Sequence, residues 1–91
     1  MPGYVQHAGA PINRTDSGIV SKAGGSLLGF YVNSTTSGTI VLRSGTLAGS
    51  TAVSGTITPA IGWHEFPAAF PDGCYATIAN TLDVTFAFAA G

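Results

Sequence analysis

The sequence has few charged side chains. They make up 8% of its 91 residues, whereas about a quarter of the residues in an average soluble domain are charged. Within residues 38–88 the only charged side chains are those of Arg43, Glu65, Asp72 and Asp83. General acid–base, nucleophilic and metal-dependent catalysis all need several reactive groups in one place. We therefore expect no enzyme, no cofactor and no metal site.

Basic clusters, export signals and long apolar segments are also missing. The three basic residues, Arg14, Lys22 and Arg43, are scattered, so the chain lacks the electrostatic footprint of a nucleic-acid-binding protein. The first 14 residues contain neither the basic nor the apolar region of a signal peptide. No stretch is long enough to span a bilayer. These absences predict a protein made in the cytoplasm that binds neither nucleic acid nor a membrane.

Cys74 is the only cysteine of the chain. A single cysteine excludes an internal disulfide, and it excludes a zinc site built from the cysteines of one chain. Because Cys74 lies in the alternating run GCYATIA, we expect a small buried thiol and not a reactive one.

The sequence does contain a series of short runs rich in Val, Ile, Thr, Phe and Tyr. From Ser26 onward these runs are bounded by Gly, Pro, Ser and Asn at intervals of about ten residues. No segment has the periodicity of a helix, and we expect an all-β protein, a small antiparallel β-sandwich of the jelly-roll-like or Ig-like kind. The expected strands are residues 27–32, 39–43, 52–58, 62–66, 73–79 and 83–89.

Larger apolar residues alternate along most of these runs, which predicts the side that faces the core. The expected inward-facing residues are Leu28, Phe30, Val32, Ile40, Leu42, Val53, Ile57, Cys74, Ala76, Ile78, Val84, Phe86 and Phe88.

Turn-forming compositions predict chain reversals at residues 33–38, 44–49 and 71–73. Residues 80–83 are expected to join the last two strands as a hairpin. Pro59 and Pro67 flank Trp63, and neither proline can donate a ladder hydrogen bond. They therefore predict that this segment lies at an edge or a corner of a sheet.

Residues 1–25 differ from the rest of the chain. They contain Pro2, Pro11 and two of the three basic residues, but little sustained periodicity. We interpret them as an extended N-terminal arm outside the core, followed by a β-sandwich domain over residues 26–91. Within the arm, residues 4–7 and 18–22 are expected to add edge strands or to lie along a neighbouring subunit.

His7, His64 and Glu65 are the only candidates for acid–base chemistry. Because adjacent residues of a strand point to opposite faces, we do not expect His64 and Glu65 to act together. The acidic residues are too dispersed for a calcium loop. For Asp72 and Asp83 we expect a role in turns, with each carboxylate accepting hydrogen bonds from nearby backbone N–H groups.

Aromatic residues either complete a small core or form an interface. We expect Trp63 and Phe66 to belong to the core, and at least one of Tyr31 and Tyr75 to belong to an interface. Exposed rings that stack on sugars would come from the same set, so carbohydrate binding stays open as an alternative.

Several runs of the chain together resemble small structural proteins of tailed bacteriophages. These runs are SGTIVLR at 37–43, VSGTITPA at 53–60, GWHEFP at 62–67, GCYATI at 73–78 and DVTF at 83–86. The resemblance covers residues 26–90. It implies a compact β-sandwich, made in the host cytoplasm, that decorates or cements the capsid surface or forms a small part of the tail. It implies no catalytic residues.

The resulting hypothesis is a non-enzymatic capsid decoration protein. Its expected partner is the major capsid protein or another virion protein, and we expect a homo-oligomer, with a trimer favoured. The candidate contact residues, from the arm and the exposed aromatics, are Tyr4, Val5, His7, Arg14, Tyr31, Trp63 and Tyr75.

The alternative is a lectin-like module of a tail or fibre that binds host glycans. Trp63, Tyr31 or Tyr75 would then be the stacking surface. A sugar site normally also needs several Asp, Asn or Arg side chains near the aromatic ring. Only His64 and Glu65 lie near Trp63 in the sequence, and this counts against the alternative. A glycan array would separate the two hypotheses.

Overall fold

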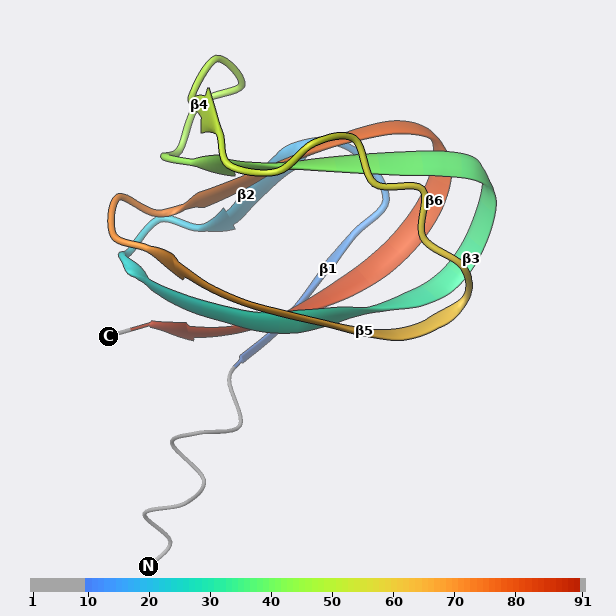
Figure 1. Ribbon diagram of the computed structural model, residues 1–91, viewed down its shortest axis with the longest axis horizontal. Coiled ribbons are helices and arrows are strands. Elements are labelled where there is room, and N and C mark those ends of the chain that lie inside the picture. The colour runs from blue at the N-terminus through green and yellow to red at the C-terminus, as the bar shows by residue number, and fades with distance from the viewer. Residues whose placement is uncertain (1–9, 91) are drawn as a thin grey trace, which may run out of the picture.

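The computed structural model describes residues 10–90, and it is all-β with antiparallel pairing throughout (Figure 1). The all-β class expected from the sequence is confirmed. The strands are β1 (Ala10–Arg14), β2 (Gly18–Ser21), β3 (Gly25–Ser44), β4 (Thr51–Ala52), β5 (Gly62–Phe70) and β6 (Cys74–Ala90).

Two long strands, β3 and β6, form the centre of a single six-stranded sheet. They pair with each other from the Gly25–Ala90 pair to the Ser44–Cys74 pair. On the far side of β3, β5 pairs with its first part and β4 with its last two residues. On the far side of β6, β1 pairs with its last part and β2 with its first part.

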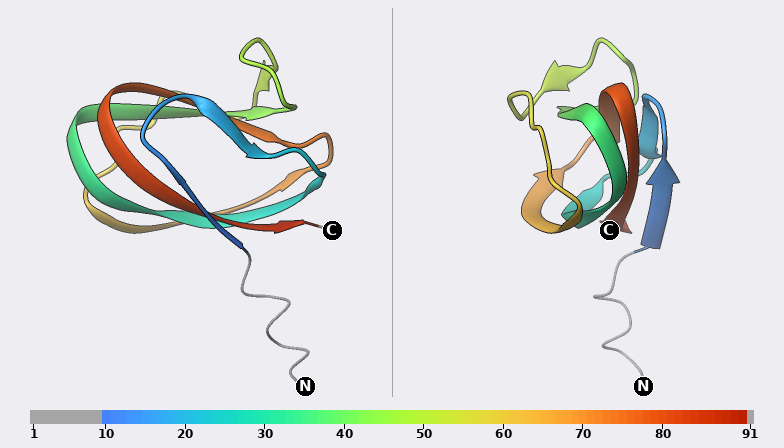
Figure 2. Two further views of the ribbon diagram at one scale, coloured as in Figure 1. Left: turned by 180° about the vertical axis from the view of Figure 1, so that it is seen from behind. Right: turned by 90° about the vertical axis from the view of Figure 1, so that its right-hand side faces the viewer.

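The sheet bends over on itself so that one half of it faces the other half, as Figures 1 and 2 show. We call one part the β5 half; it comprises β5, residues 25–32 of β3, residues 84–90 of β6, and β1. The β4 half comprises β4, residues 39–44 of β3, residues 74–79 of β6, and β2. The strand order β5, β3, β6, β1 can be followed across the β5 half in the right-hand view of Figure 2.

Both central strands bend at the same place. The register between them shifts at Val32/Ser34 and again at Thr36/Ser37, and such bulges bend a strand and increase its twist. Ser37 (φ 55°) and Asn80 (φ 62°) adopt the left-handed conformation there. The Asn80 Nδ2 donates a hydrogen bond to the Ser37 carbonyl oxygen at 2.8 Å, which ties the two bends together.

The chain does turn back at residues 33–38 and 80–83, as Figure 1 shows, but the expected break between strands at 33–38 and the hairpin expected at 80–83 are wrong. Both segments are continuous parts of β3 and β6. Their polar, Gly- and Asn-containing composition does serve a local change of direction, but as a bend that leaves the strand pairing in place. The reversals expected at residues 44–49 and 71–73 are confirmed, and in the second the Gly73 N–H donates to the Phe70 carbonyl oxygen at 3.2 Å.

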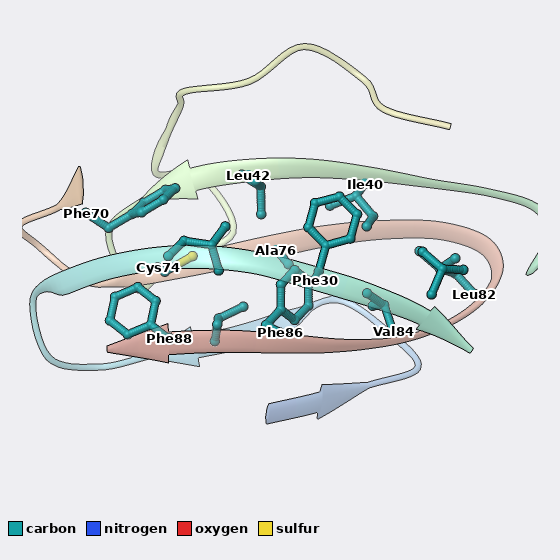
Figure 3. Close-up of a cluster of buried hydrophobic side chains, with 13 residues drawn as sticks. Phe30, Ile40, Leu42, Phe70, Cys74, Ala76, Leu82, Val84, Phe86 and Phe88 are labelled. Carbon is teal, nitrogen blue, oxygen red and sulfur yellow. The ribbon is translucent and has the colours of Figure 1, made fainter. Parts of the chain in front are cut away.

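The core lies between the two halves of the sheet (Figure 3). Phe30, Val84, Phe86 and Phe88 of the β5 half point toward Leu42 and its neighbours of the β4 half. Among the described residues, the core consists of Val20, Leu27, Phe30, Val32, Ile40, Leu42, Phe70, Cys74, Ala76, Leu82, Val84, Phe86 and Phe88. The alternation of apolar residues along the sequence predicted most of these core residues.

The prediction that Leu28 and Val53 face the core is wrong. A bulge between Leu27 and Gly29 shifts the register, so Leu27 is fully buried in the core while Leu28 is only half-buried. Val53 is exposed, because β4 ends at Ala52 and the expected strand over 52–58 is reduced to an isolated bridge between Ile57 and Ile40. Ile57 and Ile78 are half-buried, and Ile78 packs against the core.

Part of the expected N-terminal arm belongs to the folded body. β1 and β2 both pair with β6, and Val20 is 4% exposed within the core. The expectation that residues 10–25 contribute nothing to the core is wrong for Val20, because alternation over only four residues of β2 is too short to recognise. Residues 1–9, which include Tyr4, Val5 and His7, lie outside the described residues.

Candidate binding surfaces

Tyr31 and Trp63 form an exposed aromatic pair on the outer face of the β5 half. They are cross-strand partners in the ladder between β3 and β5, and their side chains are 47% and 49% exposed. Directly opposite residues on one face of an antiparallel ladder have Cβ atoms about 5 Å apart. The expectation that Trp63 belongs to the core is wrong, whereas Phe66 does pack against the core.

The Trp63 indole lies directly over the backbone of Gly29. This glycine is buried, and a Cβ atom added to it would come within 2.6 Å of Trp63 Cζ2 and 2.7 Å of Trp63 Cη2. The six-membered ring of the indole therefore covers the glycine backbone. One face of the ring rests on the sheet, so the half-exposed side chain offers its other face to solvent.

Four polar side chains form a hydrogen-bonded group beside this pair, which we call the acceptor cluster: Asn13, Asn33, Asp83 and Thr85. The Asn13 Nδ2 donates to Asp83 Oδ1 at 2.7 Å and to Thr85 Oγ1 at 3.1 Å. The Asn33 Nδ2 donates to the same two atoms at 3.2 Å and 3.1 Å. A further hydrogen bond runs from Asn13 Nδ2 to the Val84 carbonyl oxygen at 3.2 Å.

These contacts fix how the two amides are oriented. An ionised carboxylate only accepts hydrogen bonds, so the amide nitrogens must face Asp83 and the amide oxygens must point away from it. Both donated bonds reach Asp83 Oδ1, and Oδ2 receives none from the residues that the structure describes. The cluster thus holds several hydrogen-bond acceptors in place without using them.

The aromatic pair and the acceptor cluster are in register with each other. Trp63 pairs with Tyr31, Tyr31 pairs with Thr85, and Thr85 pairs with Asn13. We call this line across β5, β3, β6 and β1 the aromatic row. Neighbouring strands lie about 4.8 Å apart, so the row is about 14 Å long.

The role expected for Asp83 is wrong. Asp83 lies within β6, and it accepts hydrogen bonds from side-chain amides and not from the backbone of a turn. Sequence reasoning also missed Asn13, Asn33 and Thr85 as possible site residues. The alternating polar residues Asp83 and Thr85 on β6 were a signal for an outward face, but nothing in the sequence placed Asn13 beside them.

His64 and Glu65 do point to opposite sides of β5, as expected. His64 turns inward, stacks on Phe30 with 5.3 Å between ring centroids, and has its Nε2 2.7 Å from the Ala60 carbonyl oxygen. Glu65 is exposed on the outer face. Within residues 10–90, no group of three or more His, Cys, Asp or Glu side chains is placed to hold a metal ion.

Arg14 and Tyr75, the other described residues that were expected to contact a partner, lie on different parts of the sheet. Arg14 forms an ion pair with Asp16, with 2.8 Å between Nη2 and Oδ1, at the edge formed by β1. Tyr75 is half-buried on the β4 half, where it pairs with Arg43 on one side and Ile19 on the other. Of the candidates within residues 10–90, only Tyr31 and Trp63 are brought together.

A second group of exposed apolar residues, which the sequence did not predict, lies between residues 47 and 53, in the loop that joins β3 to β4, in β4 and just after it. Leu47 is 70% exposed and Val53 is 48% exposed, and Ala48 and Ala52 are exposed as well. We call these four residues the apolar tip. The loop projects from the body of the sheet, as Figure 1 shows at β4.

The loop that carries the apolar tip is held by hydrogen bonds at both ends. The Ser50 N–H donates to the Leu47 carbonyl oxygen and the Leu47 N–H donates to Ser50 Oγ, both at 3.0 Å. Arg43 Nη1 donates to the Ser50 carbonyl oxygen, also at 3.0 Å. Gly45 begins the loop at φ 136°, a conformation that favours glycine. The side chains of Leu47 and Ala48 therefore stand on a backbone that hydrogen bonds hold in place.

The thiol of Cys74 is buried among the apolar residues of the core. Burial in the apolar core raises the pKa of Cys74 to about 12, because the charged thiolate is unfavourable away from water. This agrees with the small, unreactive thiol expected from the sequence.

Neither a family model nor a curated protein nor a solved structure shows significant similarity to the chain. The described residues also contain no helix that is long and apolar enough to cross a membrane.

Proposed function

We propose that the protein is a non-enzymatic structural protein of a bacteriophage virion, and that it decorates the capsid by binding subunits of the shell. The single observation that supports this proposal best is the apolar tip. Exposed Leu47 stands on a loop whose backbone is fixed by hydrogen bonds, and exposed Val53 follows directly after β4. An apolar surface on an ordered backbone loses little conformational entropy when a partner covers it.

The energetic gain from covering the tip is substantial. Complete burial of one Leu side chain is worth about 1.5–3 kcal/mol, and Leu47 is 70% exposed before binding. A surface poor in charge also loses little hydration when it is buried. Many copies on one shell, or a trimer of the protein, would add these contributions through avidity.

The proposal includes the finer architecture and the oligomeric state. We propose that the curled sheet acts as a small jelly-roll-like sandwich. Tyr4, Val5 and His7 lie outside the described residues, and we propose that they contact a neighbouring subunit. A homotrimer bound to the major capsid protein at the virion surface is the arrangement that we favour.

The test is to mix the purified protein with expanded, undecorated capsids. We expect stoichiometric binding and a higher melting temperature of the shell, because a ligand that binds only the assembled form stabilises it. The variant Leu47→Ser should bind roughly tenfold more weakly or worse. Ile61→Ser is the matched control, since Ile61 is similarly exposed at 64% but comes just before β5, whose start lies at the other end of the sheet from β4 in Figure 1.

Two results would remove this proposal. One is no binding of the wild-type protein to the shell at micromolar concentration. The other is equal binding by the wild-type protein and the Leu47→Ser variant, which would show that the apolar tip makes no contact with the shell.

A lectin-like module of a tail or fibre is the second candidate function. The observation that favours it is the position of the acceptor cluster directly beside Tyr31 and Trp63. Polar partners for a sugar, which the sequence did not place near the aromatics, are thus present on the same face.

A further inference from the structure

We propose that the aromatic row and the acceptor cluster together bind a neutral oligosaccharide on the outer face of the β5 half. This inference rests on the second candidate function and not on capsid binding. It names the ligand class and assigns roles to residues: Trp63 and Tyr31 stack on sugar rings, and Asp83, Asn13 and Asn33 accept hydrogen bonds from sugar hydroxyls.

The aromatic part of the site suits the apolar face of a sugar ring. Aromatic rings are electron-rich on their faces, which attract weakly positive C–H groups. The Trp63 indole is fixed against buried Gly29 and leaves one face open. Tyr31 continues the surface on the next strand. Because the Trp63 ring already rests on the sheet, stacking costs little additional ordering.

The polar part of the site suits the hydroxyl groups at the edge of the same ligand. The amide oxygens of Asn13 and Asn33 point away from Asp83, and Asp83 Oδ2 receives no hydrogen bond from residues 10–90. Hydrogen bonds to a carboxylate are worth about 1.5–3 kcal/mol, more than those between neutral groups. The acceptors are also held in place before the ligand arrives, which lowers the entropic cost of binding.

The charges on this face select a neutral ligand. Its charged side chains among the described residues are Asp83 in the acceptor cluster and Glu65 beyond Trp63, and both are acidic. Arg14 belongs to β1 as well, but it is the register partner of inward-facing Val84 and is ion-paired with Asp16. An anionic sugar would meet repulsion with no cation among these described side chains to offset it, whereas a neutral chain would meet none.

The length of the row indicates more than one sugar unit. Trp63 and Thr85 are separated by two strand spacings, about 10 Å, with Tyr31 between them. One ring stacked on the indole cannot also reach Asp83. A chain of two or more rings can stack on Trp63 and Tyr31 and still present hydroxyls to the acceptor cluster.

Trp63 is the only tryptophan of the chain, so its fluorescence reports directly on the site. We would titrate the full chain with maltose, cellobiose, lactose and chitobiose as neutral probes, and with sialyllactose as the anionic probe. At least one neutral disaccharide should change the emission saturably in the millimolar range. Sialyllactose should bind at least roughly tenfold more weakly than that sugar.

The variants Tyr31→Ala and Asp83→Ala should each weaken this binding roughly tenfold while Trp63 remains as the reporter. Tyr75→Ala is the matched control, because Tyr75 is an aromatic residue of the other half of the sheet, without an acceptor cluster. Circular dichroism of each variant checks that the sheet is intact. If Asp83→Ala does not fold, Tyr31→Ala still tests the site, because its side chain is exposed.

Failure of this inference differs from failure of capsid binding. No emission change with any neutral disaccharide at tens of millimolar would overturn the saccharide site, as would equal binding of sialyllactose. If the wild-type protein bound no sugar and Trp63→Ala lost binding to the shell, the aromatic row would be a protein contact instead. Retained sugar binding in Leu47→Ser would separate the aromatic row from the apolar tip.

Discussion

Phe30 and Tyr31 are neighbours on β3 and point to opposite faces of the sheet. Phe30 is 1% exposed and packs against Phe86 with 5.9 Å between ring centroids, whereas Tyr31 is 47% exposed beside Trp63. The same alternation continues on β6, where buried Val84 and Phe86 flank outward-facing Thr85. A shift of one residue along the strand thus changes a core position into a surface position.

The difference between the two faces separates folding from binding. The inner face buries apolar rings that hold the two halves of the sheet together. The outer face exposes two rings and an ordered group of polar side chains, and these contribute little burial. Substitutions on the inner face should therefore change stability, and substitutions on the outer face should change contacts with other molecules.

The largest effect is expected from Phe30→Ala, with Tyr31→Ala as its neighbour and control. Removal of the buried Phe30 ring leaves a cavity and should lower the free energy of unfolding by about 3–5 kcal/mol. Tyr31→Ala should lower it by less than about 1 kcal/mol, because half of its surface is already in water. Urea unfolding followed by circular dichroism measures both, and similar losses in the two variants would contradict the assignment of the faces.

A smaller effect is expected for Cys74 at alkaline pH. The thiol pKa is raised from 9.0 to about 12 by burial, so above about pH 9 the unfolded chain loses a proton that the folded chain keeps. Stability should therefore fall as the pH rises from 9 toward 12. One proton corresponds to about 1.4 kcal/mol per pH unit, or about 2 kcal/mol at roughly pH 10.5.

The control for this pH dependence is Cys74→Ala, because Tyr and Lys side chains also titrate in the same range. The difference between the wild-type protein and the variant isolates the contribution of the thiol. Unfolding free energies at several pH values between about 8 and 11 should converge for the two proteins as the pH rises. A constant difference between them would show that Cys74 is not protected from ionisation by the core.

The sequence predicted the inner face well, because burial imposes a strict two-residue period. Phe30, Val32, Val84, Phe86 and Phe88 followed directly from alternation. The period failed where the backbone adds a residue: the bulge at Leu27/Gly29 exchanged Leu28 for Leu27. A bulge depends on the pairing of two strands, and one strand's sequence does not reveal it.

The bends escape prediction for a related reason. Residues 33–38 and 80–83 each have the composition of a turn, and that composition alone predicts a chain reversal. In the structure Thr35 pairs with Leu82 and Ser37 with Thr81, so the two segments lie opposite each other and bend together. Local composition indicates that the chain changes direction, but only the pairing between distant segments decides by how much.

The candidate site was predictable only in part. Tyr31 and Trp63 were candidates because aromatic residues that do not complete the core form interfaces. The acceptor cluster was not predictable, since Asn13 and Asp83 are 70 residues apart and meet only because β1 pairs with the end of β6. The apolar tip was missed because the strand expected over 52–58 placed Val53 in the core.

The smallest effect is expected at the bend, where the alternation of the two faces is interrupted. Asn80 adopts φ 62° and its side chain donates to the Ser37 carbonyl oxygen. Ala at this position would meet the steric penalty of the left-handed conformation, about 1 kcal/mol, and would lose an exposed hydrogen bond. Asn80→Ala should therefore lower the free energy of unfolding by about 1 kcal/mol. Asn80→Gly, which tolerates positive φ, should cost less.

Thermal unfolding of the two Asn80 variants distinguishes backbone strain from the hydrogen bond. A lower melting temperature for Ala than for Gly shows that the left-handed backbone conformation itself costs stability in the Ala variant, because the hydrogen bond is lost in both. Equal melting temperatures would show that the bond to Ser37 dominates, because both variants lose it. If neither variant differed from the wild-type protein, the bend would owe nothing to Asn80. It would then be imposed by the apolar residues on either side, Ile78 and Leu82, through their packing in the core.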